Sequence, residues 1–145
     1  MLQLDEARVL LADDTDSIRQ TMRECLTAIG FHPDNIIEAE DGNAALDIIF
    51  DDPTPDLIVT DWAMPFRTGL DVIRETRKDF GLFPPCILAT TKHFEDEIDR
   101  AKTELASLGN AIYFDKRGEI SAEALLNKVR ELTFAGDARL PKFEG

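Results

Sequence analysis

Three aspartates stand directly after apolar runs, where their carboxylates could share one site. Asp13 and Asp14 follow the apolar run at residues 8–12, and Asp61 follows the run at residues 57–60. If both runs are neighbouring parallel strands, the three carboxylates meet beyond the carboxyl edge of the sheet. Two like charges about 4 Å apart repel by roughly 4 kcal/mol at an effective dielectric of about 20, so this cluster requires a cation.

A hard divalent cation fits the cluster because no His or Cys stands beside the three aspartates. Mg²⁺ binds one or two carboxylates, a phosphate oxygen and several waters. Its two positive charges would leave the three carboxylates with one negative charge in excess. Lys116, just past the apolar run at residues 111–114, is expected to balance that charge. Thr90, at the end of the run at residues 86–90, is expected to supply a hydroxyl donor.

The elements that must position these side chains alternate regularly along the chain. Apolar runs typical of buried strands lie at residues 8–12, 35–39, 57–60, 86–90 and 111–114. After each run, apolar residues recur at helical spacing, and Asp16 and Ser121 are expected to cap the first and last helices, with Gly30 ending the first. This alternation predicts an α/β, flavodoxin-like, doubly wound sheet of five parallel strands in the order 2-1-3-4-5, with helices on both faces.

The acidic composition of the chain limits the kinds of partner that it can bind. The chain of 145 residues carries 29 Asp and Glu against 16 Lys and Arg, a formal net charge of −13. So acidic a chain repels phosphate backbones and anionic lipid, so we expect no direct binding to nucleic acid or membrane. The first residues lack the positive charge and apolar run of a secretory signal. We therefore expect a cytoplasmic protein with Cys25 and Cys86 as reduced core thiols.

The residues at the strand ends resemble those of one known family, the receiver domains of two-component response regulators. The resemblance runs from about residue 8 to residue 132. The segments EAEDG at residues 38–42, DWAMP at 61–65 and GLD at 69–71 are especially similar to the CheY-like receivers of chemotaxis. The resemblance implies a signalling phospho-acceptor rather than a classical enzyme. Its phosphoryl group would come from a sensor histidine kinase or a phosphotransfer protein.

The resemblance also implies how the phosphoryl group and its cation are held. Asp61 would be the phospho-acceptor, since a carboxylate can attack phosphorus and form an aspartyl phosphate. Asp14, Asp61 and the backbone carbonyl of Ala63 would bind Mg²⁺, with Asp13 acting largely through water. By the same resemblance, the Ala63 side chain would help to set the lifetime of the phosphoryl group.

Residues of the fourth and fifth strands would bind the phosphoryl group and transmit its presence. By the resemblance, Thr90, the backbone amide of Thr91 and Lys116 contact the phosphoryl oxygens, and Lys92 tunes the lifetime. Thr90 and Tyr113 would form a switch in which Tyr113 turns inward on phosphorylation, although an ordinary core aromatic is an equally open interpretation of Tyr113. A downstream protein target would read the change on the fourth helix, fifth strand and fifth helix.

Residues 5–133 are predicted to form the receiver domain, and residues 134–145 a C-terminal tail or linker. Arg117 departs from the family, which usually has proline after the lysine of the fifth strand. One alternative is a receiver fragment of a longer regulator with an output domain. Another is a haloacid-dehalogenase-like phosphatase, phosphorylated on Asp14 of the acid-x-acid segment at residues 14–16. A flavodoxin-like electron carrier is the third, but the acidic residues 13–16 would repel its phosphate.

Overall fold

Five parallel strands form one sheet in the computed structural model, which describes residues 3–51, 53–91, 94–118 and 120–132. The strands are β1 (Val9–Ala12), β2 (Ile36–Ala39), β3 (Leu57–Asp61), β4 (Cys86–Thr90) and β5 (Ala111–Asp115). Their order in the sheet is β2-β1-β3-β4-β5, which confirms the predicted fold class and strand order. β3 extends one residue further than predicted, so Asp61 is itself the last residue of that strand.

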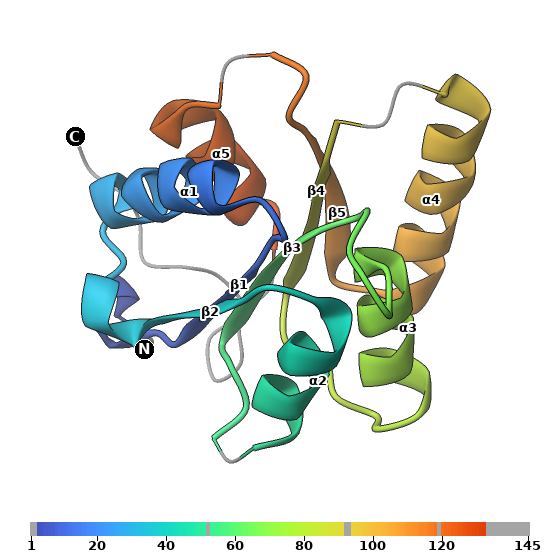
Figure 1. Cartoon of the computed structure of the whole chain (residues 1–145), viewed down its shortest axis with the longest axis horizontal. Helices are drawn as coiled ribbons and strands as arrows, with labels where there is room; N and C mark the ends of the chain where they lie inside the picture. The colour runs from blue at the N-terminus through green and yellow to red at the C-terminus, as the bar shows by residue number, and fades with distance from the viewer. Residues whose placement is uncertain (1–2, 52, 92–93, 119, 133–145) are drawn as a thin grey trace.

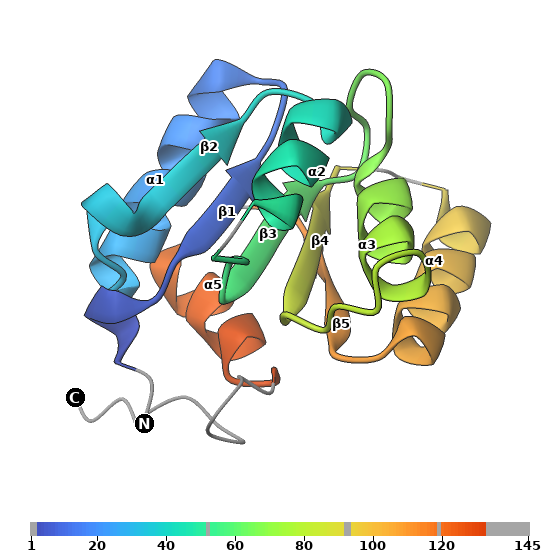
Figure 2. The ribbon, with the colours of Figure 1, turned by 90° about the horizontal axis from the view of Figure 1, so that it is seen from below.

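Helices cover both faces of this sheet. They are α1 (Asp16–Ile29), α2 (Gly42–Phe50), α3 (Gly69–Lys78), α4 (Glu95–Leu108) and α5 (Ala122–Val129), with short 3-10 helices at Leu4–Glu6 and Pro33–Asn35. α1 and α5 lie side by side on one face, and α2, α3 and α4 lie on the other (Figures 1 and 2). None of the described helices is long and apolar enough to cross a membrane.

Alternate residues of each strand supply two separate cores. In β1, Val9 and Leu11 belong to the core under α1 and α5, whereas Leu10 and Ala12 belong to the core under α2, α3 and α4. All four residues are almost fully buried. A strand with helices on both faces has no solvent-facing side, which explains why its sequence is a continuous apolar run rather than an alternating one.

The first helix starts differently from the prediction. α1 begins at Asp16 with Thr15 as its cap residue, so the predicted capping role of Asp16 is wrong. The Asp16 carboxylate instead pairs with Arg19 at 2.5 Å. The other two signals are confirmed, because Gly30 ends α1 at φ +130° and the Ser121 hydroxyl accepts a hydrogen bond from Ala124 N–H at 3.1 Å.

A buried arginine ties together the loops at the amino edge of the sheet. The Arg77 guanidinium of α3 donates to the carbonyls of Pro84 at 2.7 Å and Gly109 at 3.1 Å, and lies 3.5 Å from Sγ of Cys86. Burial raises the pKa of the Cys86 thiol to about 11. Both cysteines are free, but Cys25 is only half-buried, so the expectation of two core thiols is right for Cys86 alone.

The connection from β3 to α3 brings two backbones together at Gly69. An added Cβ there would lie 1.9 Å from the carbonyl oxygen of Asp61. The Gly69 N–H donates to the carbonyl of Trp62 at 2.8 Å, and Thr68 and Asp71 form a capping box at the start of α3. The first turn of α3 therefore rests directly on the backbone that carries Asp61.

We expect Gly69→Ala to destabilise the protein by about 3 kcal/mol, because the methyl group cannot enter without separating α3 from β3. Urea unfolding measures the change. Gly118→Ala is the matched control, since an added Cβ there meets nothing within 4 Å, and it should change stability by less than about 0.5 kcal/mol. Equal unfolding midpoints for the two variants would contradict this view of the connection.

Candidate functional site

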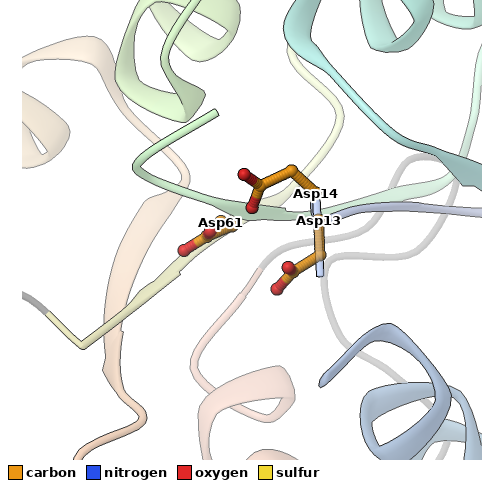
Figure 3. A group of neighbouring side chains, drawn as sticks. All are labelled: Asp13, Asp14 and Asp61. Carbon is orange, nitrogen blue, oxygen red and sulfur yellow. The ribbon is translucent and has the colours of Figure 1, made fainter. Parts of the chain in front are cut away.

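Three carboxylates meet at the carboxyl edge of the sheet, as the spacing predicts. Asp13 and Asp14 follow β1, and Asp61 ends the adjacent strand β3. One oxygen of each carboxylate lies within 4.8 Å of the corresponding oxygens of the other two. Figure 3 shows the three side chains turned toward a common space. Like charges this close repel one another, so the cluster calls for compensating positive charge.

Lys116 reaches into this cluster from the end of β5. Its Nζ lies 2.9 Å from Oδ2 of Asp13 and 3.2 Å from Oδ1 of Asp61, and its side chain is only 4% exposed. The Lys116 N–H donates to the carbonyl of Thr90 at 2.8 Å, which fixes the backbone from which the side chain starts. Three carboxylates and one ammonium leave the cluster with two excess negative charges, the charge that one divalent cation would neutralise.

Every polar group of Asp13 already has a partner within the protein. Its N–H donates to the carbonyl of Ala39 at 3.1 Å, and its carbonyl accepts from Arg19 at 2.6 Å. Its two carboxylate oxygens accept from the Thr15 N–H at 2.9 Å and from Lys116 at 2.9 Å. Asp13 is therefore built into the scaffold of the site.

Asp14 contrasts with its neighbour. It is exposed, and its carboxylate makes no hydrogen bond or ion pair with any residue in the described ranges. An uncommitted carboxylate beside one buried and one partly buried carboxylate is the donor set that suits a hydrated, oxygen-seeking cation such as Mg²⁺. The residues therefore fit that ion.

Asp61 is held on one side only. Its Oδ1 accepts from the Trp62 N–H at 2.9 Å and from Lys116, whereas Oδ2 accepts no hydrogen bond from the described part of the chain. Burial raises the pKa of Asp61, and the charge of Asp13 adds to that effect, while Lys116 opposes it. The surroundings thus disfavour the ionised carboxylate, and added positive charge would stabilise it.

Thr90 and Ala63 lie where the sequence expects them. Thr90 ends β4, whose preceding residue Ala89 pairs with Asp61, and it is 2% exposed. Ala63 is exposed two residues beyond Asp61, and Thr91 is exposed at the start of the next loop. Lys92 lies outside the described residues. Their roles toward a phosphoryl group stay predictions.

Tyr113 differs from the position that the switch hypothesis assumes. The ring is already buried in β5, with Nζ of Lys102 5.2 Å from its centroid, so no inward turn is needed to bury it. The Tyr113 hydroxyl is also buried and has no hydrogen-bond partner among the residues that the structure describes. Burial raises its pKa. A buried hydroxyl without a partner is costly, which makes this position sensitive to any rearrangement nearby.

A local turn replaces the proline that the family usually has after its lysine. The Arg117 N–H donates to Oδ1 of Asp115 at 2.8 Å, and the Arg117 guanidinium pairs with the same carboxylate at 2.5 Å. These contacts join the residues immediately before and after Lys116, so the loop has a local constraint without proline.

Sequence reasoning missed Arg19, which contacts the site through the carbonyl of Asp13. The signal was present, since Arg19, Met22 and Leu26 share the buried face of α1. A charged residue on an apolar helix face needs buried partners. Two of those partners, Asp16 and Glu38, come from the start of α1 and from β2.

Comparison with known proteins agrees with the fold and the site. Residues 9–130 match the response regulator receiver domain. The chain is 32% identical over 126 residues to the chemotaxis protein CheY of Pseudomonas aeruginosa, covering 86% of this chain and 94% of that protein. The solved structure of CheY4 from Vibrio cholerae has a TM-score of 0.69 and 28% identity, covering 87% of this chain and 98% of that one. A Francisella response regulator receiver domain has a TM-score of 0.67 and 26% identity, covering 84% and 92%.

These matches extend over nearly all the elements that build the carboxylate site. The chain therefore belongs to the receiver domains of two-component response regulators, and it is CheY-like.

Proposed function

We propose that this receiver domain accepts a phosphoryl group on Asp61. The observation that carries the proposal is the asymmetry of the Asp61 carboxylate. Lys116 and Trp62 hold Oδ1, whereas Oδ2 has no hydrogen-bond partner in the described part of the chain. An oxygen that is oriented but uncommitted is suited to nucleophilic attack.

The transfer forms one bond and breaks one. An oxygen of Asp61 bonds to the phosphorus of a phosphohistidine, and the bond from phosphorus to the imidazole nitrogen breaks. The imidazole leaves with that electron pair and takes up a proton, and an aspartyl phosphate remains. Because the incoming group is anionic and the site is acidic, the main task of the protein is alignment and charge neutralisation. Lys116 contributes a positive charge that is already in place.

Asp14, Asp61 and the backbone carbonyl of Ala63 would hold Mg²⁺, which supplies the remaining positive charge when bound. The Asp14 carboxylate has no partner among the described residues, which supports a direct contact for this residue. Asp13 would act through water, since both of its carboxylate oxygens already accept hydrogen bonds.

The phosphoryl oxygens would be held by Thr90, Lys116 and the backbone amide of Thr91, with Ala63 and Lys92 tuning the lifetime of the phosphoryl group. The closeness of β4 and β5 to Asp61 supports these assignments, because Ala89 pairs with Asp61 and the Lys116 N–H bonds to Thr90.

CheY-like receivers are signalling proteins that interact with histidine kinases and downstream targets. We propose that this chain takes its phosphoryl group from a sensor histidine kinase or a phosphotransfer protein in a chemotaxis-like pathway. Its target would bind the face formed by α4, β5 and α5 once Thr90 moves toward the phosphoryl group and the Tyr113 ring, which is already buried, adjusts to that move. We also predict a cytoplasmic location and a C-terminal tail at residues 134–145, which lie outside the described residues. An output domain beyond the receiver stays an alternative. The phosphatase alternative gives Asp61 and its contact with Lys116 no role.

We expect acetyl phosphate with Mg²⁺ to add one phosphoryl group to the wild type and none to Asp61→Asn, because the amide is not a nucleophile. Intact-mass measurement reads the result. Asp34→Asn, which alters an exposed carboxylate far from the cluster, is the control and should react normally. Addition of a chelator should stop the reaction in every variant. Equal labelling of Asp61→Asn and wild type would refute the acceptor assignment.

We expect Asp14→Ala to lose Mg²⁺ affinity without losing stability, because its carboxylate has no partner in the described part of the chain to give up. Asp13→Ala should keep more of the affinity but lose about 1–3 kcal/mol of stability, since the Thr15 N–H would lose its acceptor and Lys116 one of its two carboxylate partners. Titration of Trp62 fluorescence with Mg²⁺ and urea unfolding separate the two effects. An unchanged affinity in Asp14→Ala would remove this residue from the cation site.

We expect Thr90→Ala to weaken the response of the α4, β5 and α5 face to phosphorylation. A hydroxyl that contacts the phosphoryl group in one state only is the differential contact that a population shift needs, and about 1.4 kcal/mol of it shifts the equilibrium tenfold. Amide hydrogen exchange with and without beryllofluoride measures the response. Thr27→Ala, on the exposed side of α1, is the control. A full response in Thr90→Ala would mean that the signal leaves by another route.

A further inference from the structure

The geometry points to Arg19 as a positioning residue for the cation site, acting through the backbone of Asp13. The Arg19 side chain is 10% exposed, and its Nη1 donates to the carbonyl of Asp13 at 2.6 Å. This inference rests on the proposed function, because the site that Arg19 would position is the one assigned to Mg²⁺.

The contact constrains Asp14 although Arg19 does not touch that residue. The carbonyl of Asp13 belongs to the peptide unit that joins Asp13 to Asp14, and a peptide unit is planar. Fixing the carbonyl therefore fixes the direction in which the chain enters Asp14. Since the Asp14 side chain has no partner in the described ranges, its backbone is what can orient it before a cation binds.

Other groups hold the guanidinium in a single orientation. Nε of Arg19 lies 2.6 Å from Oε1 of Glu38, and Nη2 lies 2.5 Å from Asp16. Arg23, one turn further along α1, binds the second oxygen of Glu38 at 2.7 Å. Burial opposes ionisation of Glu38, but the hydrogen bonds from Arg23 and Arg19 outweigh it and lower the pKa of Glu38. Glu38 therefore remains ionised at neutral pH and keeps its ion pair with Arg19.

A lysine could not replace this arrangement. Arg19 uses three nitrogen atoms to bind a β2 side chain, an α1 side chain and a loop carbonyl in three directions. The planar guanidinium carries its donors in a fixed fork, whereas an ammonium is a single flexible point. Charge alone would be kept by lysine, but orientation would be lost.

The positioning role and a purely electrostatic role predict opposite results. Removing a positive charge near the carboxylates should, by Coulomb's law alone, strengthen the binding of a divalent cation. Removing the contact that orients the Asp14 backbone should weaken it. Loss of a group that supports a metal ligand typically costs 10–100-fold in metal affinity.

The test compares Mg²⁺ affinity in Arg19→Gln, Arg19→Lys and the matched control Arg23→Gln, by titration of Trp62 fluorescence and by calorimetry. Arg23→Gln removes an arginine of the same helix that also binds Glu38, and it removes the hydrogen bonds of that arginine to the carbonyls of Pro33 and Ile36. None of these contacts involves the three carboxylates of the cation site. We expect about tenfold weaker binding in both Arg19 variants and a change below twofold in Arg23→Gln.

Each result has a defined meaning. Equal or tighter Mg²⁺ binding in Arg19→Gln would overturn the inference, and so would equal weakening in Arg23→Gln at matched loss of stability. Faster amide exchange of Asp14 and Thr15 in Arg19→Lys without Mg²⁺ would support it, and unchanged exchange would count against it. If the wild type itself bound no Mg²⁺, the proposed function would fail. A wild type that binds Mg²⁺ beside unaffected Arg19 variants would refute the role of Arg19 alone.

Discussion

The ammonium group of Lys116 lies between two nearly buried carboxylates, and the arrangement of the site depends on it. Burying an ion costs several kcal/mol even after relaxation, and only close, well-aligned partners repay that cost. Lys116 meets Asp13 at 2.9 Å and Asp61 at 3.2 Å, so one cation permits two acidic groups to remain inside. The same contacts join β5 to β1 and β3 across β4. The proposed phosphoryl site and the assembly of the sheet thus share one ion cluster.

A second constraint comes from the loop that follows Asp61. Phe66 adopts φ +70°, and the Arg67 N–H donates to the carbonyl of Pro65 at 2.9 Å, which closes a tight turn. For a bulky residue this conformation costs of order 1–3 kcal/mol. It persists because neighbouring elements hold the residues on both sides of Phe66: the Gly42 N–H donates to the Pro65 carbonyl at 3.3 Å, and the Arg67 guanidinium binds Glu75 at 2.8 Å. The loop that carries Ala63 is therefore a preset part of the site.

The face proposed to read the phosphoryl group is also linked to the rest of the molecule. Arg74 of α3 donates two hydrogen bonds to the Glu104 carboxylate of α4, at 2.6 and 2.9 Å. The hydrogen bond from Arg74, together with its charge, lowers the pKa of Glu104 despite partial burial. A movement of α4 must either move α3 with it or break the two hydrogen bonds between Arg74 and Glu104. This ion pair therefore stabilises the position of α4 that the structure shows.

The amino-acid sequence is enough to predict the five strands, their helices and the three aspartates at one edge. These features follow from local patterns, because a buried parallel strand is a continuous apolar run and a side chain just after it must lie at the carboxyl edge. The difference between the two neighbouring acids arises only when the chain folds. Asp13 and Asp14 are adjacent and chemically identical, yet Asp13 is fully hydrogen-bonded and the Asp14 side chain has no partner within the described ranges. The difference arises because Lys116 reaches Asp13 from the end of β5 and Arg19 reaches it from α1. Partners that are distant in sequence leave no local pattern, so the contacts of Arg19 and the burial of Tyr113 required the fold.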